Sequence, residues 1–580
     1  MKMTGAELVV KALKAEGVDT LFAYPGGQVI DLFDALYEEK EIEVILPRHE
    51  QGLVHAADGY ARSTGKVGVC LVTSGPGAAN LVTGIATANY DSVPLVCLTG
   101  QVPTGLIGHD TFQEVDIVDM VKSVCKYAVM VRRREELAGA IQKAFAAART
   151  GRPGVALVDL PKDIQRACGD GAYQKETLCG ETTGRHAFQS TDFRAKIDRA
   201  AEILAGAKRP LFLVGGGVRI GRAEAEMQRL VEAAGVPVVT TIMGKGAIPS
   251  THELYIGNLG IHGSYAANMA VSHCDVLFAV GTRFNDRITG NVEQFAAQAV
   301  IIHVDIDAGH ISRNIAADIG IAADAGEAVR ALLEKVKPSD TGDWRRLIRN
   351  WKRQHPIGAK KPGLTPENIL EAINRTFDSA VIATDVGQNQ LWATQFLALN
   401  EKKRMLTSGG LGTMGYGLPA AIGAKIGNPG KDVVVIAGDG GMQMNIQEMA
   451  TAVCYELPIT ICILNNGYLG NVRQWQELFF DRRYSWTCMR WRRGCAQTCN
   501  SPTGSCPPYT PDFIRLAESY GAKGIRVTGE EEIEAALETA RRTEKLPTVI
   551  EFIIEREANV WPIVPPGKGL ADMLFPEDMF

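Results

Sequence analysis

The stretch "IAGDGGMQMNIQEMATAVCYELPITICILNN" (residues 436–466) places polar residues directly after two apolar runs. Asp439 follows the first run within a group of glycines, and Asn466 follows the second run. The two runs and the helix predicted from about Met442 to Tyr455 form a βαβ unit, in which the strands must be parallel. The carboxyl ends of parallel strands meet at one edge of a sheet, so we expect Asp439 and Asn466 to lie close together.

A carboxylate and an amide at this edge are part of a coordination shell for Mg²⁺, which takes few protein ligands and adds phosphate and water. The glycines at positions 438, 440 and 441 allow backbone N–H groups to approach an anion. These residues therefore predict a site for Mg²⁺ and a diphosphate. A tight turn and an Asn-rich loop without any ligand would explain the same spacing.

The composition is typical of a soluble globular protein, with 46% hydrophobic and 22% charged residues. A formal charge of -5 and a pI near 6.1 give no reason to expect nucleic acid as a partner. No apolar run is long enough to span a membrane, and the first residues read as an amphipathic helix starting at Thr4 rather than a signal peptide. We therefore expect a cytosolic protein whose twelve cysteines are mostly reduced.

Short runs rich in Val, Ile and Leu alternate with helical patterns along the whole chain of 580 residues. This alternation predicts three consecutive doubly wound α/β domains with mainly parallel sheets. Stretches around 166–190 and 338–365 have weaker apolar periodicity and are interpreted as linkers. The expected domains are residues 1–168, 190–340 and 364–555, followed by a tail at 556–580.

The GDG at 438–440 and the NN at 465–466 resemble the cofactor signature of thiamine-diphosphate (ThDP) enzymes. Over nearly its whole length the chain resembles one branch of them, the large catalytic subunits of acetolactate (acetohydroxyacid) synthases. The motifs that carry this resemblance are "YPGG" (24–27), "RHEQ" (48–51), "TSGPGAANLVTGIATA" (73–88), "GQVPTGLIGHDTFQE" (100–114), "GTRFNDRITG" (281–290), "SGGLGTMGYGLPAAIGA" (408–424) and "QWQELFF" (474–480).

The resemblance implies decarboxylation of pyruvate on ThDP and ligation of the hydroxyethyl carbanion to pyruvate or 2-oxobutyrate, the first common step of valine, leucine and isoleucine biosynthesis. It also implies Mg²⁺, FAD, a homodimer or dimer of dimers with shared active sites, and a separate regulatory small subunit. The three expected domains would be a pyrimidine-binding domain, a central FAD-type domain and a diphosphate-binding domain. Two alternatives stay open: a pyruvate oxidase-type flavoenzyme, and a paralog that only binds the cofactors.

By this resemblance, Glu50 is the catalytic residue that hydrogen-bonds the aminopyrimidine ring of ThDP. A helix cap before Gln51 is its plainer interpretation. Met414 would hold ThDP bent, although a Met between glycines is more often a core residue. The residues implied to bind ThDP are Gln388, Asn389 (usually His in the family), Gly412, Met414, Asp439, Gly440, Gly441 and Asn466, and those implied to bind Mg²⁺ are Asp439, Asn466 and Tyr468 through its backbone oxygen.

The middle third carries segments that match the FAD-binding segments of the biosynthetic branch, although a GGG after a strand is more often a turn. Asn285 replaces the usual Asp of the family, and Gln28 stands where many members have a small residue. The implied FAD residues are Gly215, Gly216, Thr241, Ile242, Leu259, Gly260, Ile261, His262, Gly281, Thr282, Arg283, Phe284, Asn285, Asp305, Ile306 and Asp324. The implied substrate-channel residues are Gly27, Phe112, Gln113, Lys126, Arg287 and Trp475, with Trp475 selecting the second 2-oxo acid.

An insertion of about residues 486–510 departs from the family pattern. It contains Cys488, Cys495, Cys499 and Cys506, with the spacing C-x6-C-x3-C-x6-C. Four cysteines this close in a cytosolic enzyme suggest an iron–sulfur cluster or a structural zinc ion. The spacing matches neither the common ferredoxin pattern nor the zinc-ribbon pattern, so thiols or disulfides without a metal are a third possibility.

Overall fold

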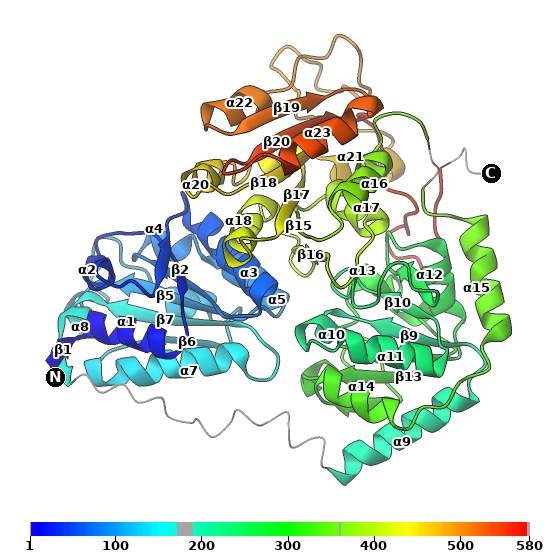
Figure 1. The fold of residues 1–580 in the computed structure, drawn as a ribbon, viewed down its shortest axis with the longest axis horizontal. Helices are drawn as coiled ribbons and strands as arrows, with labels where there is room; N and C mark the ends of the chain where they lie inside the picture. Colours follow the sequence, from blue (N-terminus) through cyan, green and yellow to red (C-terminus); the bar gives the residue numbers. More distant parts are fainter. Residues whose placement is uncertain (1, 171–189, 359–360, 577–580) are drawn as a thin grey trace.

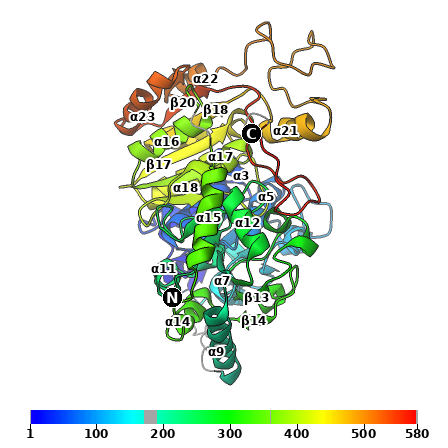
Figure 2. The ribbon, with the colours of Figure 1, turned by 90° about the vertical axis from the view of Figure 1, so that its right-hand side faces the viewer.

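The computed structural model describes residues 2–170, 190–358 and 361–576, and it contains three six-stranded parallel sheets, each covered by helices on both faces (Figures 1 and 2). The predicted α/β class with three parallel sheets is confirmed. Apolar strands such as "DVVVIAG" are buried along their length because helices cover both faces of each sheet. Among the helices of the described ranges, none is both long and apolar enough to cross a bilayer.

The N-terminal sheet has the strand order β3-β2-β4-β5-β7-β6. One of its faces packs against the first, second, seventh and eighth helices, and the other packs against the third to sixth. Its strands are β2 (Thr20–Ala23), β3 (Glu43–Ile45), β4 (Gly68–Val72), β5 (Leu95–Gln101), β6 (Tyr127–Met130) and β7 (Val155–Pro161). Its helices are α1 (Gly5–Ala15), α2 (Ile30–Tyr37), α3 (Glu50–Thr64), α4 (Pro76–Ala79), α5 (Val82–Tyr90), α6 (Ile117–Val121), α7 (Leu137–Arg149) and α8 (Lys162–Arg166).

Thr4 caps α1, as the sequence predicts, and Glu7 completes a capping box with it. The residues before this helix form β1 (Lys2–Thr4), which pairs antiparallel with β8 (Cys168–Asp170). The start of the described chain is therefore tied to the last strand of the N-terminal domain. The rest of the first predicted linker, from 171 to 189, lies outside the described residues.

The middle sheet has the order β11-β10-β9-β12-β13-β14. Its strands are β9 (Pro210–Val214), β10 (Val238–Thr240), β11 (Tyr255–Asn258), β12 (Val276–Val280), β13 (Val300–Asp305) and β14 (Ile319–Ala322). Helices α9 (Thr191–Gly206), α10 (Gly216–Ile220), α11 (Glu224–Ala234) and α14 (Ala325–Leu333) cover one face, and α12 (Tyr265–His273), α13 (Asp286–Thr289) and α15 (Gly342–Gln354) cover the other.

Helix α15 lies inside the stretch 338–365 that the sequence suggested as a linker. It buries Trp344, Ile348 and Trp351 against the middle sheet, and the indole N–H of Trp344 donates to the carbonyl of Pro210. These three residues follow the i, i+4, i+7 spacing of one helix face. The rest of the helix is so rich in Arg and Lys that the narrow apolar stripe is easily overlooked.

The C-terminal sheet has the order β16-β15-β17-β18-β20-β19. Its strands are β15 (Ala380–Thr384), β16 (Arg404–Leu406), β17 (Asp432–Gly438), β18 (Ile459–Asn465), β19 (Lys523–Val527) and β20 (Thr548–Ile553). Helices α16 (Pro366–Thr376), α17 (Gln388–Phe396) and α23 (Ile533–Arg541) pack on one face, and α18 (Gly417–Gly427), α19 (Asp439–Met442), α20 (Glu448–Cys454) and α22 (Phe513–Ser519) pack on the other. Helix α21 (Gly470–Phe479) follows β18.

The helix predicted from Met442 to Tyr455 is wrong in one respect, because the structure splits it into α19 and α20. Between them the backbone forms i to i+3 turns, such as Glu448 N–H to the Asn445 carbonyl at 3.1 Å. The Asn445 side chain donates to the carbonyl of Gly415, 2.8 Å away. The interruption therefore anchors the glycine-rich loop around Met414.

Helices α3 and α18 cross closely and join the N-terminal domain to the C-terminal domain, as Figure 1 shows. A Cβ at Gly59 would overlap the carbonyl of Ala420, and a Cβ at Gly423 would overlap that of Ala56. Both glycines are therefore needed for this approach. Beside the crossing, buried Arg62 pairs with Asp58 at 2.6 Å and Asp91 at 3.0 Å.

Candidate active site

Asp439 and Asn466 directly follow β17 and β18, two neighbouring strands, as the sequence predicts. Only 1% of Asp439 is exposed, and its Oδ2 atom has no hydrogen-bond partner. Burial raises the pKa of Asp439 to about 7, although hydrogen bonding with Tyr509 lowers it. A buried carboxylate oxygen without a partner fits a cation, which would supply the missing interaction.

Asn466 is held by the side chain of Gln388 and by the backbone of its own loop. Its amide Nδ2 donates to Gln388 Oε1 at 3.0 Å, and its Oδ1 accepts from the backbone N–H of Tyr468 at 3.0 Å. Gln388 in turn donates to Gln474 Oε1 at 3.0 Å. Gln388, at the start of α17, is thus brought to the Asn466 loop as expected. Asn389 instead donates to the carbonyls of Asp385 and Ile436, and these contacts fix the end of β15 beside β17.

Asp385 is a residue that the sequence reasoning did not select. It is fully buried after β15, and its carboxylate accepts from the backbone N–H groups of Val386, Gly415 and Gly417 at 2.8 to 3.1 Å. A Cβ at Gly441 would overlap Asp385 Oδ1. The signal was present, since Asp385 directly follows the apolar run "AVIAT", as Asp439 follows "VVVIAG".

The loop fixed by Asp385 brings Met414 to the glycines after β17. A Cβ on Gly440 would lie 3.7 Å from Met414 Cε, so this side chain and that backbone are neighbours. Met414 is half-buried, and Gly412 is exposed with a φ of +74°, a conformation that favours glycine. Met414 therefore lies over the Asp439 turn rather than in the hydrophobic core, which agrees with its predicted position against the cofactor.

Glu50 is the first residue of α3 and does not cap that helix. The cap is His49, whose Nδ1 accepts from the backbone N–H of Gln51 at 3.1 Å. The Glu50 carboxylate instead accepts from the amide of Asn80 at 2.9 Å. The helix-cap interpretation is therefore wrong, and one carboxylate oxygen remains available for another group.

Arg287 and Trp475 line one cavity of about 500 Å³ between the middle and C-terminal domains. Gly412 of the Met414 loop and Asn285 line the same cavity. The indole N–H of Trp475 is buried without a hydrogen-bond partner. Arg287 supplies a cation, Trp475 an aromatic wall, and Gly412 belongs to the Met414 loop. A cavity with these groups suits a small carboxylate substrate.

The other predicted channel residues lie in the N-terminal domain and do not line this cavity. Phe112 is 82% exposed, and Gln113 lies against Gly75. The ammonium group of Lys126 donates to the carbonyls of Ala147 and Thr150 at 2.5 and 2.6 Å. Gly27 accepts a hydrogen bond from Lys162 at 2.6 Å. A single chain therefore does not bring these four residues and Glu50 together with Arg287 and Trp475.

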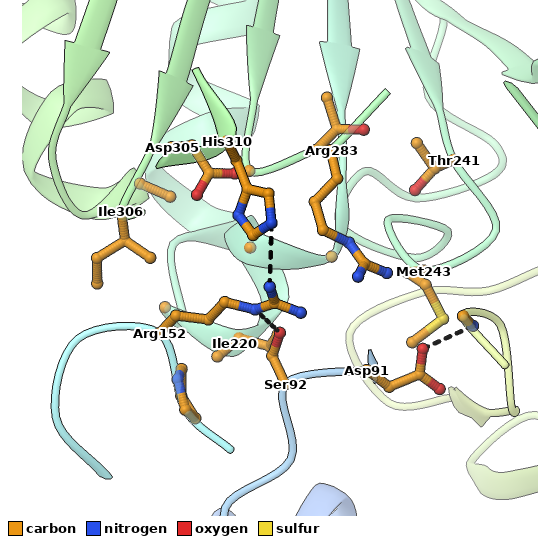
Figure 3. A pocket seen from close by; sticks show the side chains of 18 of the residues that line it. Asp91, Ser92, Arg152, Ile220, Thr241, Met243, Arg283, Asp305, Ile306 and His310 are labelled. Carbon is orange, nitrogen blue, oxygen red and sulfur yellow. Dashed lines mark hydrogen bonds between the residues drawn. The ribbon is translucent and has the colours of Figure 1, made fainter. Parts of the chain in front are cut away.

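A second cavity, of about 330 Å³, is lined by all three domains (Figure 3). The predicted FAD residues in its lining are Gly216, Thr241, Ile242, Gly281, Thr282, Arg283, Asn285, Asp305, Ile306 and Asp324. Three further predicted residues, Leu259, Ile261 and His262, line the cavity of Arg287 and Trp475 instead. Most of the predicted FAD residues are therefore brought together at two adjoining cavities. The two linings share Ile242, Asn285, Arg287, Ile288, Gly409 and Gly410.

Three predicted FAD residues line neither cavity. A Cβ on Gly215 would overlap the Gly281 carbonyl, so these two strand ends meet only because position 215 is glycine. A Cβ on Gly260 would likewise overlap the carbonyl of Arg287. The ring of Phe284 is buried against His303, with ring centroids 4.8 Å apart. It belongs to the core.

The N-terminal domain contributes residues to the second cavity that the sequence reasoning missed. Arg152 donates to Ser92 Oγ at 2.8 Å and lies 3.3 Å from His310 Nε2, and Figure 3 shows it facing Arg283 across the cavity. Burial and the nearby guanidinium of Arg283 lower the pKa of Arg152. Asp91 accepts from the backbone N–H of Gly410 at 2.7 Å. Two facing guanidinium groups favour an anion such as the diphosphate of a dinucleotide.

The four cysteines of the insertion line a third cavity, of about 320 Å³, together with Tyr468. All four are free thiols. Over the described ranges of the chain, no three His, Cys, Asp or Glu side chains are gathered closely enough to hold one metal ion. A site for a single zinc ion, which the spacing left open, is therefore not formed by these thiols as they stand.

Comparison with known proteins agrees with this architecture. Residues 3–120, 197–332 and 385–552 match the family models for the N-terminal TPP binding domain, the central domain and the C-terminal TPP binding domain of thiamine pyrophosphate enzymes. The acetolactate synthase large subunit of Corynebacterium glutamicum is 43% identical, over 99% of this chain and 90% of that protein. The probable acetolactate synthase large subunit of Methanocaldococcus jannaschii is 42% identical (99% and 95%), and the acetolactate synthase isozyme 2 large subunit of Escherichia coli K12 is 42% identical (99% and 99%). With this coverage, and with the parallel-sheet domains described above, the chain belongs to the acetolactate synthase large-subunit family of thiamine pyrophosphate enzymes.

Proposed function

We propose that this chain is the catalytic subunit of an acetolactate synthase. It would decarboxylate pyruvate and join the remaining two-carbon unit to a second pyruvate or to 2-oxobutyrate, the first common step of branched-chain amino-acid biosynthesis. The observation that carries this proposal is the shared cavity of Arg287, Trp475 and Gly412. It places a cation for a substrate carboxylate beside the loop that holds Met414.

The C-terminal domain fits Mg²⁺ and a diphosphate. Asp439 offers an unpartnered oxygen, and Asn466 and the Tyr468 carbonyl lie on the neighbouring loop. When bound, thiamine diphosphate supplies a nucleophilic carbon that adds to 2-oxo acids and accepts the electrons left by CO₂. The residues proposed to hold this cofactor are Gln388, Asn389, Gly412, Met414, Asp439, Gly440, Gly441 and Asn466.

Glu50 is proposed to hold a proton at its free carboxylate oxygen and to hydrogen-bond the pyrimidine of the cofactor. Asn80 fixes the other oxygen at 2.9 Å, so the carboxylate has a set orientation. A positioned carboxyl group of this kind can take part in general acid–base catalysis. Because Glu50 does not line the cavity of Arg287 and Trp475, we propose that the N-terminal domain of a second copy completes each site.

FAD is proposed to occupy the cavity lined by all three domains. Its fit rests on Arg152 and Arg283, two guanidinium groups that line one cavity, and on the close glycine approaches at positions 215 and 281. The residues proposed to bind FAD are those of this cavity and of its neighbour given above. Their role is to bind the flavin and join the domains, since ligation of two 2-oxo acids transfers no net electrons.

Several relatives are named large subunits, and we propose that this chain also works with a separate regulatory small subunit. A homodimer or dimer of dimers is proposed as the catalytic form. The cytosolic location and the domain boundaries at 1–168, 190–340 and 364–555 stay predictions.

The test is product analysis without oxygen or any electron acceptor, using the full chain with pyruvate, thiamine diphosphate, Mg²⁺ and FAD. We expect acetolactate, and acetohydroxybutyrate when 2-oxobutyrate is added. Glu50→Gln should lower kcat by about 10²-fold or more while thiamine diphosphate still binds. The matched control Glu38→Gln, at an exposed position, should behave as the unchanged enzyme. Acetate with reduced flavin and no acetolactate would show a pyruvate oxidase-type enzyme instead.

A further inference from the structure

The connection from α21 to α22, residues 480–512, contains the insertion and forms no helix or strand of its own. It contains turns, and its Cys488 forms an isolated antiparallel bridge with Tyr468, which lies before α21. Connections of this length without regular structure are uncommon in compact domains and are usually functional. Figure 2 shows the insertion extending away from β18 and α21.

The thiols of Cys488, Cys495, Cys499 and Cys506 all line one cavity of about 320 Å³. Three of these cysteines each close a turn through a backbone hydrogen bond to the residue three positions earlier. The N–H of Cys495 donates to the Arg492 carbonyl, that of Cys499 to the Ala496 carbonyl and that of Cys506 to the Thr503 carbonyl. The repeated turn presents successive thiols to the same space.

Several N–H groups donate to the sulfur atoms. The backbone N–H of Arg492 donates to Cys495 Sγ at 3.4 Å, and that of Thr503 donates to Cys506 Sγ at 3.3 Å. Such N–H···S hydrogen bonds stabilise thiolates and tune the sulfur ligands of metal clusters.

Arg556 adds positive charge beside two of the thiols. Its guanidinium donates to Cys506 Sγ at 3.1 Å and to Cys488 Sγ at 3.6 Å, and it stacks on the Tyr468 ring 4.9 Å from the centroid. Arg490 also lines the cavity and donates to the carbonyl of Cys506 at 3.0 Å. N–H donors and positive charge therefore lie beside the sulfur atoms, as suits the sulfur ligands of a metal cluster.

We propose that these four cysteines hold an iron–sulfur cluster in this cavity. A single zinc ion needs four sulfur atoms about 2.3 Å from one point, and no such gathering is present in the described part of the chain. In a [4Fe–4S] cluster each iron takes one thiolate, so the four sulfur ligands lie around the cluster and not around a single ion. Four cysteines that line one cavity with Arg490, and Arg556 beside Cys488 and Cys506, match this arrangement.

The cluster site adjoins the loop that carries Asn466 and Tyr468. The N–H of Met489 donates to the Gly467 carbonyl and the N–H of Leu469 donates to the Thr487 carbonyl, both at 2.9 Å. A cluster that orders the insertion thereby also orders this loop. The effect of the cluster on Mg²⁺–thiamine diphosphate binding rests on the function proposed above, whereas the cluster itself does not.

The direct test is iron and acid-labile sulfide analysis of the full-length chain, purified without oxygen and reconstituted with iron and sulfide. We expect about two to four iron atoms per chain, an equal amount of sulfide, and visible charge-transfer absorption. Cys495→Ser should lower the iron content several-fold, and Cys168→Ser, an exposed thiol outside the insertion, should leave it unchanged. If Cys495→Ser does not fold, the iron and sulfide content of the unchanged chain still tests the proposal.

An intact chain that takes up no iron and sulfide after reconstitution would overturn the proposal, and so would stoichiometric zinc without sulfide. With iron present, chelation of the iron should weaken thiamine diphosphate binding by about tenfold, read from tryptophan fluorescence. Acetolactate formation is measured separately on the same samples. Iron binding without acetolactate formation would support the cluster proposal and refute only the proposed function.

Discussion

The carboxylate of Asp385 accepts hydrogen bonds from the backbone N–H groups of Gly415 and Gly417, with each Oδ2 contact 3.0 Å long. One side chain at the end of β15 thus fixes the backbone on both sides of Tyr416. Helix α18, which begins at Gly417, crosses α3 of the N-terminal domain. The same carboxylate therefore sets both the Met414 loop and the start of the helix that joins two domains.

Asp385→Asn replaces one accepting oxygen with an amide that faces N–H donors. We expect the loop to loosen, with a loss of about 1–3 kcal/mol in the free energy of unfolding and at least tenfold weaker thiamine diphosphate binding. Denaturant titration and cofactor titration measure the two effects. The exposed control Asp378→Asn should change neither, and unchanged cofactor affinity in Asp385→Asn would contradict this role.

The burial of His55 predicts that the free energy of unfolding depends on pH. Both ring nitrogens are buried without hydrogen-bond partners, and burial, followed by the charge of Arg62, lowers the pKa of His55 to about 3. The unfolded chain binds a proton near the ordinary value of 6.5 while the folded chain does not, so stability falls as the pH drops from 6.5 towards 3. His55→Phe should remove a slope of about 1.4 kcal/mol per pH unit.

Urea unfolding midpoints between pH 5 and pH 8 measure this difference. Exposed His109→Gln serves as the control and should keep the slope of the unchanged chain. A His55→Phe variant with the same slope would show that His55 is charged in the folded state.

Arg62→Met tests the junction between the N-terminal and C-terminal domains. The change leaves Asp58 and Asp91 buried without their cation, and breaking a buried pair in this way costs about 3–5 kcal/mol. The variant should unfold at lower urea concentration. Arg133→Met breaks an exposed pair with Glu136 and should cost less than about 1 kcal/mol; equal losses in both variants would contradict the role of burial.

Gly215→Ala tests the flavin cavity. The added methyl group would overlap the Gly281 carbonyl and push apart the ends of β9 and β12, so FAD affinity should fall by tenfold or more. Flavin fluorescence quenching measures it. Gly206→Ala, at the end of α9 with open space around its Cβ position, should bind FAD normally and unfold at slightly higher urea concentration.

The sequence predicts the sheets well because buried parallel strands are continuous apolar runs, such as those ending at Asp439 and Asn466. It predicts α15 poorly, since three apolar residues among many cations give a weak signal. It also misses Asp385 and Arg152, whose importance depends on which backbone N–H groups and which domains surround them. Contacts between residues distant in the chain, such as Asp91 with Gly410, have no local pattern that could reveal them.

The cavity proposed for FAD takes its walls from all three domains, with Ser92 and Arg152 from the first, Arg283 and Asp305 from the second and Gly410 from the third. Any ligand that fills it binds the docked arrangement of the domains and not the separated one. By mass action, such a ligand raises the stability of the whole chain in proportion to the logarithm of its concentration. If FAD binds there as proposed, it would hold the three domains together reversibly, and the supply of flavin would set how much of this enzyme is assembled.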